Sequence, residues 1–269
     1  MKSQSRKFDN SSEKLVEGLC SIVILTHNQV EYTKLCLESI ESFLNVDHEI
    51  IFVDNASTDG TIEYLSGIVE KNKNYSLINN SENRGYAAGN NMGIYAAKGE
   101  FVLIMNNDIL ITQGAVESLI NVLKDNKQSV LVGPTTNFVN RGQLDLEAEY
   151  GTVEEMVTYA EQNAKVNKGE SSKTEFLGGF MFLGRTDLLK EVGGFDESFG
   201  IGNYEDNDLC MKLTQKGYEL RIAKDSYVHH FGHVSFNASG IDYNELVEKN
   251  KKIYEDKWSG VKDEKVEVV

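Results

Sequence analysis

Short apolar runs alternate with longer segments of helical periodicity along the first half of the chain. The run Cys20–Thr26 (CSIVILT) is continuously apolar and rich in β-branched residues, which is typical of a strand buried on both faces. Four later runs share this character and predict further strands: Ile50–Val53, Leu77–Ile78, Phe101–Met105 and Val130–Val132. The segments between them predict helices at 30–44, from Thr61 onward, at 86–97 and at 114–124. This alternation predicts βαβ units and therefore a parallel sheet covered on both faces.

The second half has a less regular pattern. We predict a loop segment at 136–152, a helix at 153–166 and a glycine-containing strand at Thr174–Leu183. The remaining elements expected are a helix at Glu205–Lys216, strands at 218–223 and 226–230, and a charged helix at 242–257. Residues 1–18 are rich in Ser, Lys and Glu, so we expect a flexible arm followed by one domain at 19–269.

Composition narrows the class of protein. The chain has 269 residues, and its 27 Lys and Arg stand against 42 Asp and Glu, for a net charge of −15. Because nucleic-acid binding requires Lys and Arg to neutralise phosphates, this charge argues against a nucleic-acid partner. A single proline, Pro134, excludes collagen-like and proline-rich classes.

Cysteine usage and hydropathy suggest a cellular compartment. Cys20, Cys36 and Cys210 are widely spaced and form no CxxC pair, which fits a reducing environment. The N-terminal residues contain no apolar signal core, and no apolar run approaches the length of a membrane span. We therefore expect a soluble cytoplasmic protein without a transmembrane segment.

Polar and acidic residues cluster in the loops that follow the predicted strands. In open parallel sheets, ligands bind beyond the carboxyl ends of the strands. The loops concerned are Thr26-His27-Asn28, Asp54–Gly60, Asn79–Gly85 and Asn106-Asn107-Asp108. These loops are the first places to look for a ligand site.

Two of these loops carry residues suited to a nucleotide. Asp54 ends an apolar strand, where its carboxylate can accept hydrogen bonds from a base or a ribose. A turn followed by a helix cap around Asp59 explains the same loop equally well. Arg84 could pair with a phosphate, and Gly85 and Gly89 allow close backbone approach. Neither a Walker nor a Rossmann fingerprint is present, and simple helix-start chemistry is the alternative.

Two acids and a cluster of three histidines suit metal and proton chemistry. A hard carboxylate such as Asp108 can hold Mg²⁺ or Mn²⁺ while a diphosphate supplies further oxygens, although a polar turn is the plainer explanation. Asp206 shares a helix face with the apolar Leu209 and Leu213, which would raise its pKa and suit a general base. Acids in a first helical turn also complement the helix dipole. The cluster His229, His230 and His233 is a candidate metal or phosphate site.

Taken in order, these segments resemble family 2 glycosyltransferases. The resemblance extends from about Cys20 to Trp258. It is carried by seven segments: SIVILTHN, IIFVDNASTDGT, NRGYAAGNN, LIMNND, FLGGFMFLGRTDLLKEVGGFDESF, YEDNDLC and HHFGHVS. It implies the GT-A fold of the α/β class. In that fold a Rossmann-like, mostly parallel sheet binds the nucleotide-sugar in a first half (about 19–135), and a mixed second half (136–269) forms the acceptor and catalytic side. The segments VGGFDESFG and YEDNDLC lean towards the rhamnosyltransferase-like branch.

The resemblance also implies an activity. Members of the family transfer a sugar from a nucleotide-diphospho-sugar, here UDP- or dTDP-linked, with a divalent cation (Mn²⁺ or Mg²⁺) and inversion of the anomeric centre. Asp54 corresponds to the acid that reads the base, with Thr26 and Asn28 in the same pocket. Arg84 and Gly85 correspond to the loop beside the ribose and phosphates.

The remaining correspondences concern the metal, the sugar and the proton. Asp108 corresponds to the metal-binding last acid of the family's Asp-x-Asp motif, in which Asn106 replaces the first acid and Asn107 stands between them. Asp206 corresponds to the catalytic base, with Glu205 beside it on the donor side. His230, five residues before Ser235, aligns with the histidine that completes the metal site. Gly178-Gly179 corresponds to the segment beneath donor sugar and acceptor.

Other functions and partners stay open at this point. The acceptor expected is a saccharide, a lipid-linked sugar or a protein, and the family allows peripheral contact with the inner face of a membrane. The sequence does not indicate an oligomeric state. One alternative is a catalytically silent nucleotide-sugar-binding scaffold. A sugar-1-phosphate nucleotidyltransferase is the other, but it would need a glycine-rich, basic loop where the chain has Thr26-His27-Asn28.

Overall fold

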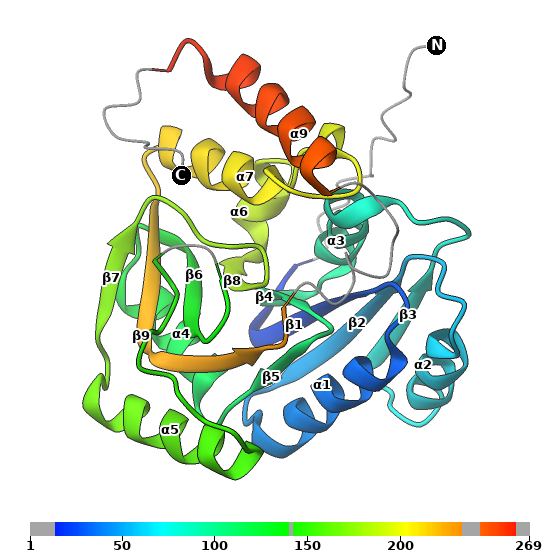
Figure 1. Ribbon diagram of the computed structural model, residues 1–269, viewed down its shortest axis with the longest axis vertical. Helices are drawn as coiled ribbons and strands as arrows, with labels where there is room; N and C mark the ends of the chain where they lie inside the picture. The colour runs from blue at the N-terminus through cyan, green and yellow to red at the C-terminus, as the bar shows by residue number, and fades with distance from the viewer. Residues whose placement is uncertain (1–13, 140–141, 233–242, 262–269) are drawn as a thin grey trace.

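The computed structural model describes residues 14–139, 142–232 and 243–261. The described strands form one nine-stranded sheet in the order β3-β2-β1-β4-β8-β6-β9-β5, with β7 paired to β9, and helices cover the sheet (Figure 1). The first half contains β1 (Val16–Thr26), α1 (Val30–Phe43), β2 (His48–Asp54), α2 (Thr61–Val69), β3 (Tyr75–Asn79), α3 (Gly85–Ala96) and β4 (Gly99–Asn106). Next come β5 (Ile109–Ile111), α4 (Ala115–Asp125), β6 (Ser129–Thr136), α5 (Val153–Val166), β7 (Ser171–Thr174) and β8 (Met181–Arg185). The chain continues with α6 (Thr186–Glu191), the short 3-10 helix η1 (Glu197–Phe199), α7 (Glu205–Gln215), β9 (Glu219–His230) and α9 (Tyr243–Trp258).

Strands β1 to β4 are parallel, as the alternating pattern predicts. β1 pairs with both β2 and β4, and β2 pairs with β3. The register places Thr26 beside Asp54, and Asp54 beside Asn79. The polar loops after these strands therefore begin at one edge of the sheet.

The second half of the sheet mixes directions. β8 runs antiparallel to β4 and β6, whereas β9 runs parallel to β6 and antiparallel to β5 and β7. The two strands predicted at 218–223 and 226–230 form the single strand β9, which Figure 1 shows as a bent ribbon. Its first part pairs with β7 and its last three residues pair with β5. The bend thus carries the end of β9 to the turn between β4 and β5.

The continuous strand predicted at Thr174–Leu183 is wrong. β7 ends at Thr174 and β8 begins at Met181, so residues 175–180 lie outside any strand. The physical reason is that side chains take the backbone donors of this segment. The amide of Gly178 donates to Gln143 (2.8 Å), and that of Gly179 donates to Asp206 (2.9 Å).

At the N-terminus, β1 begins inside the arm expected at 1–18. Val16 pairs with Gly99, and the amide of Gly18 donates to Glu100. Residues 1–13 of the expected arm lie outside the described residues.

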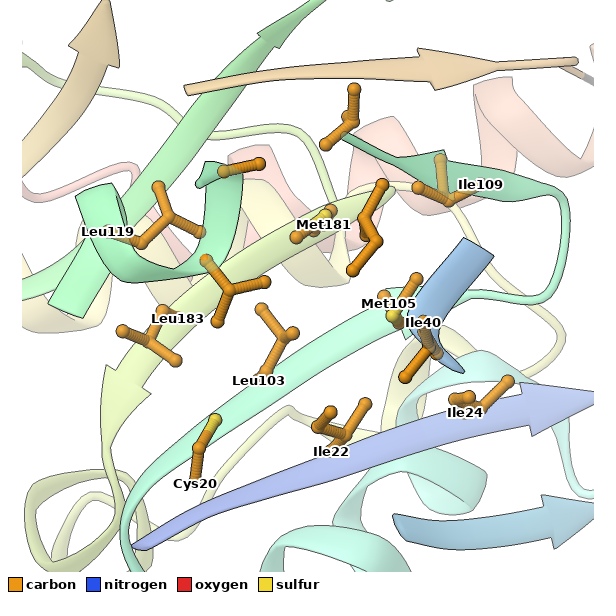
Figure 2. Close-up of a cluster of buried hydrophobic side chains, with 14 of the residues drawn as sticks. Cys20, Ile22, Ile24, Ile40, Leu103, Met105, Ile109, Leu119, Met181 and Leu183 are labelled. Atoms are coloured by element: carbon orange, nitrogen blue, oxygen red, sulfur yellow. The ribbon is translucent and has the colours of Figure 1, made fainter. Parts of the chain in front are cut away.

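Both faces of the central strands are packed, which explains their uninterrupted apolar sequence. On one face, Ile22 and Ile24 of β1 lie with Ile40 of α1 in a single buried cluster that also includes residues of α4 and β8 (Figure 2). On the other face, Val23 of β1 packs with Ile94 of α3 in a cluster that includes α6 and α7. The side chains of β1 divide between the two clusters because successive side chains of a strand point to opposite faces.

None of the described helices is both long enough and apolar enough to cross a bilayer.

Close packing of α3 on β1 generates a stability prediction. A Cβ atom added at Gly93 would lie 2.2 Å from Cγ1 of Val23, in the buried interior. We expect Gly93→Ala to lower the free energy of unfolding by about 1–3 kcal/mol through overpacking. Gly67→Ala in α2 is the matched control, because nothing lies within 4 Å of its added Cβ. That variant should gain up to about 1 kcal/mol from helix propensity. Urea denaturation measures both, and a Gly93→Ala protein as stable as the wild type would contradict the packing.

Candidate functional site

The loops after β1 and β2 are bound tightly to each other. Asp54 is fully buried, and its carboxylate accepts hydrogen bonds from Thr26 Oγ1 (2.9 Å) and from Ser57 Oγ (2.5 Å) and N (2.8 Å). The side chain of Asn28 accepts from the amide of Thr58 (2.8 Å). The structure thus brings Thr26, Asn28 and Asp54 together, as the sequence predicts. In this geometry Asp54 also holds the turn, which is the simpler explanation of the loop.

Asp59 supplies the cap expected from the sequence. Its carboxylate accepts from Thr61 N and Oγ1 at the start of α2 and from the amide of Val30 at the start of α1. These hydrogen bonds lower the pKa of Asp59 despite the opposing effect of its partial burial. One carboxylate therefore fixes the N-termini of two helices.

The loop before α3 lies in close contact with another segment of the same chain. Gly85 has a φ of 82°, and a Cβ at this position would lie 2.0 Å from the carbonyl oxygen of Gly200. The amide of Tyr86 donates to the carbonyl of Ile201 (2.9 Å). The close approach allowed by Gly85 is thus made to the segment that precedes α7. The Arg84 side chain is exposed at the start of α3.

Asp108 and His230 lie side by side, although 122 positions separate them in the sequence. The pairing of β5 with β9 brings them together, with His230 opposite Ile109. His230 Nε2 is 3.4 Å from Asp108 Oδ1, and its Nδ1 is 2.8 Å from the carbonyl of Phe138. A carbonyl only accepts, so we assign the ring proton to Nδ1, and Nε2 presents its lone pair to the site. The pair is nearly buried.

The residues at this position fit a divalent cation. Asp108 Oδ1 is buried and receives no hydrogen bond from the described residues. An unsatisfied carboxylate oxygen beside an imidazole nitrogen suits Mn²⁺ or Mg²⁺. The described residues contain no group of three or more His, Cys, Asp or Glu side chains that could hold a metal. As far as the described residues go, a cation at Asp108 and His230 would therefore need further ligands from a bound molecule or from water.

The other members of the two predicted clusters have different surroundings. His229 faces away from His230, as successive strand residues do, and its Nδ1 is 2.7 Å from the hydroxyl of Tyr150. The side-chain amide of Asn107 donates to Thr33 Oγ1 (2.9 Å), so this buried residue ties the turn to α1.

The structure describes one of three further residues named in the sequence analysis. Asn106 is half-buried at the end of β4, where its backbone amide donates to the carbonyl of Phe180 (2.9 Å). His233 and Ser235 lie outside the described residues.

Asp206 is held at the start of α7 by the backbone of another segment. Its Oδ2 accepts from the amide of Gly179 (2.9 Å), and its Oδ1 accepts from the amide of Asn207 (2.8 Å). A hydrogen bond from the Tyr86 hydroxyl to the carbonyl of Gly179 fixes the other side of that glycine. A Cβ on Gly179 would meet both Tyr86 and Asp206, at 3.2 Å and 3.5 Å, so the glycine lies between them.

Acidic groups from α7 and from the turn between β4 and β5 act on Tyr86. Burial raises the pKa of Tyr86 well above its ordinary value, and the charges of Glu205, Asp206 and Asp108 raise it further. Burial, and then the charge of Asp206, raise the pKa of Glu205 well above its ordinary value. Glu205 therefore favours its neutral form. Its neighbour Asp206 is the next residue in the same helical turn.

Sequence reasoning missed two residues that organise this region. Gln143 is buried in the segment expected to be a loop, and it accepts from Gly178 N while donating to the carbonyl of Pro134 (2.9 Å). No pattern in the sequence marks it. Tyr86 directly follows the Arg84-Gly85 pair, and this position in the motif was the one available signal for it.

Comparison with known proteins agrees with this architecture. The family model described as glycosyl transferase family 2 matches residues 21–193, more than half of the chain. Glycosyltransferase GlyG of Streptococcus pneumoniae is 25% identical over 201 residues, which cover 72% of this chain and 64% of GlyG. Among solved structures, GalNAc-T7 with UDP, GalNAc and Mn²⁺ has a TM-score of 0.69 at 16% identity, covering 88% of this chain and 47% of that one. The mannosyltransferase PcManGT of Pyrobaculum calidifontis, in complex with GDP-Man and Mn²⁺, has a TM-score of 0.60 at 19% identity and covers 81% and 59%.

These likenesses confirm the GT-A fold expected from the motifs, because both structural neighbours share the mixed α/β architecture. The chain spans only part of the curated relatives it matches, with 64%, 20% and 43% of their lengths covered by the first three.

The environment of Glu205 leads to a pH prediction. A carboxyl whose pKa is higher in the folded state binds its proton more tightly there, so stability is lost as the pH rises from the unfolded pKa through the folded one. Glu205→Gln imitates the neutral acid and should raise the melting temperature at pH 8, with a smaller gain at each step towards pH 5. The control is Glu63→Gln, which alters an exposed acid of α2. A gain independent of pH would contradict the buried, proton-binding environment of Glu205.

Proposed function

Because the chain belongs to glycosyl transferase family 2, we propose that it transfers a sugar from a UDP- or dTDP-linked donor to an acceptor hydroxyl, with inversion at the anomeric carbon. The observation that carries this proposal is that the structure holds two carboxylates in different environments. Asp108 lies beside His230 with an unsatisfied oxygen, while Asp206 is held by Gly179. Two carboxylates in different environments suit two different tasks, as an inverting displacement requires.

We assign the cation to Asp108 and His230. The lone pair of Nε2 and the unsatisfied Oδ1 are the ligands offered, and the hydrogen bond from Nδ1 to Phe138 fixes the ring orientation. When bound, Mn²⁺ or Mg²⁺ acts as a Lewis acid that stabilises the charge of the leaving diphosphate. Two solved structures with the same fold contain Mn²⁺, which supports this assignment.

The overall charge of the protein gives the cation a second role. A net charge of −15 and the acids around Tyr86 would repel a diphosphate. A divalent ion at Asp108 inverts the local charge and makes an anionic ligand acceptable. Binding of the donor should therefore depend on the cation.

We assign the general base to Asp206. One of its oxygens accepts from the amide of Gly179 and the other from the amide of Asn207, so the carboxylate has a fixed orientation. It would accept the proton of the acceptor hydroxyl as the new bond to the anomeric carbon forms. Glu205 is less suited to this task, because burial, and then the charge of Asp206, hold its pKa well above the ordinary value and favour its neutral form.

We assign the nucleotide to the loops after β1, β2 and β3. Arg84 is exposed, so its guanidinium is available to a phosphate. Gly85, the next residue, begins α3. Thr26, Asn28 and Asp54 would face the base and ribose. Since Asp54 already accepts from Thr26 and Ser57, a base would have to share its carboxylate with these partners.

Metal-dependent donor binding is the first expected outcome. UDP-, dTDP- and GDP-sugars are tested by thermal shift with Mn²⁺ or with EDTA, since a bound ligand stabilises the fold by mass action. We expect at least one donor to raise the melting temperature only with Mn²⁺, and Asp108→Ala to abolish that Mn²⁺-dependent shift. The control Asp256→Ala removes an exposed acid of α9. Unchanged metal dependence in Asp108→Ala would refute the cation site.

Loss of transfer without loss of binding is the expected result for Asp206→Asn. Removing a general base should lower the rate about 10²–10⁴-fold, while the thermal shift given by the donor stays close to that of the wild type. The rate is followed as release of nucleoside diphosphate, with saccharide, lipid-linked and protein acceptors as separate arms and water as the reference. Parallel loss of turnover and donor binding would contradict the role given to Asp206. Donor binding with no turnover in the wild type would instead favour the scaffold alternative.

A further inference from the structure

The turn that leads into α7 has a strained backbone. Asn203 and Tyr204 both have left-handed φ values, 76° and 69°, and Glu205 and Asp206 follow them directly. A non-glycine residue in this region is strained, and it persists only where surrounding contacts hold it. The contacts that hold this turn therefore determine where the two carboxyl groups lie.

One side chain of α9 binds the backbone of this turn at three points. Asn250 is fully buried, and its Nδ2 lies 2.7 Å from the carbonyl of Phe199, 2.7 Å from that of Gly202 and 3.1 Å from that of Asn203. The amide has only two hydrogens, so one of them is shared between carbonyls. Asparagine has poor helix propensity, and helix α9 gains nothing locally from it. These contacts to a distant turn give Asn250 its role.

A second contact joins α9 to α7 on the other side of Asp206. Asp208 is fully buried, and its Oδ1 is 2.7 Å from Lys257 Nζ and 2.9 Å from Trp258 Nε1. Lys257 also reaches Asp196, at the start of η1, over 2.5 Å. Hydrogen bonds from Lys257 and from Ser198 lower the pKa of Asp196 to about 2, although its burial acts in the opposite direction. Figure 1 shows α9 lying alongside α7, in agreement with these contacts.

The opposite flank of the turn is fixed by α3. The amide of Tyr86 donates to Ile201, and Gly85 packs directly against Gly200. The turn at 199–204 is thus clamped between the start of α3 and the side chain of Asn250. If Asn250 is lost, three carbonyls lose this donor, while the contact of Tyr204 with Tyr254 of α9 remains. We expect the left-handed pair to relax towards ordinary φ values, which would displace Asp206 from the amide of Gly179.

From this geometry we propose that Asn250 is a positioning residue for the reaction, acting through the strained turn on Asp206. The proposal rests on the proposed function. It distinguishes two roles within α9. Asn250 positions the carboxylate of Asp206, whereas Lys257 and Trp258 hold the helix against α7. A misplacement of about 1 Å costs on the order of 100-fold in rate, so a small relaxation of the turn suffices.

The test compares Asn250→Ala with Lys252→Ala, which removes an exposed side chain of the same helix. Turnover is measured as nucleoside diphosphate released with water as the acceptor, using the donor that gives the largest thermal shift. Rates are divided by the number of donor-binding sites from calorimetry, so that misfolded protein is not counted. We expect Asn250→Ala to lower kcat about tenfold or more while KM for the donor stays within about twofold. Lys252→Ala should match the wild type.

Docking of α9 is followed separately, because Trp258 is the single tryptophan of the chain. Its emission in Asn250→Ala should stay at the wild-type wavelength, which shows that the helix is still docked while kcat has fallen. An unchanged kcat per binding site would overturn the proposal, and so would a loss of kcat that appears only together with a red-shifted emission.

A second variant keeps the proposal testable if Asn250→Ala does not fold. Lys257→Met changes a partly exposed side chain and leaves Asn250 in place. It should lower kcat by no more than about threefold, because it loosens the docking and not the turn. A loss as large as that expected for Asn250→Ala would overturn the division of roles. A wild type with no turnover of any donor would overturn the proposed function itself, and an active wild type with equally active variants would overturn this inference alone.

Discussion

The parallel pairing of β1 with β2 and β4 is the constraint on which the rest of the structure depends. Because all three strands are parallel, their carboxyl ends lie at one edge, and the polar residues that follow them meet there. Parallel strands also require crossover helices, which bury both faces and make the strands apolar throughout. The same arrangement that needs a fully apolar core thus concentrates the polar side chains at one edge of the sheet.

The sequence predicts local features well and long-range contacts poorly. The parallel strands and their helices follow from apolar runs whose neighbours are close in the chain. The strand predicted at Thr174–Leu183 fails because Gln143 and Asp206 take the backbone donors of its glycines, and no local pattern records that. β5 has three residues, too few to show a period.

The candidate site likewise has residues that local patterns predict and residues that they do not. Asp108, His230 and Asp206 belong to recognisable motifs, so residue type and order are enough to select them. The role of Asn250 could not be predicted, because it consists of hydrogen bonds to carbonyls 47 or more positions away.

Three acids in the first turn of α7 show how different surroundings give carboxyl groups different properties. Glu205 is buried next to a like charge and favours its neutral form. Asp206 is oriented by a backbone amide, and Asp208 is fully buried but compensated by Lys257 and Trp258. The three acids are close together in the sequence, whereas their partners come from different parts of the fold.

The contact between Gly85 and Gly200 bears on how such enzymes can be recombined. A single backbone carbonyl lies where any larger residue at position 85 would place its Cβ, so the start of α3 and the segment before α7 meet at this point through backbone atoms. A chimaera that takes either segment from a homologue must therefore keep glycine at position 85 and the path of the chain at position 200. The two segments are interchangeable only as a matched pair.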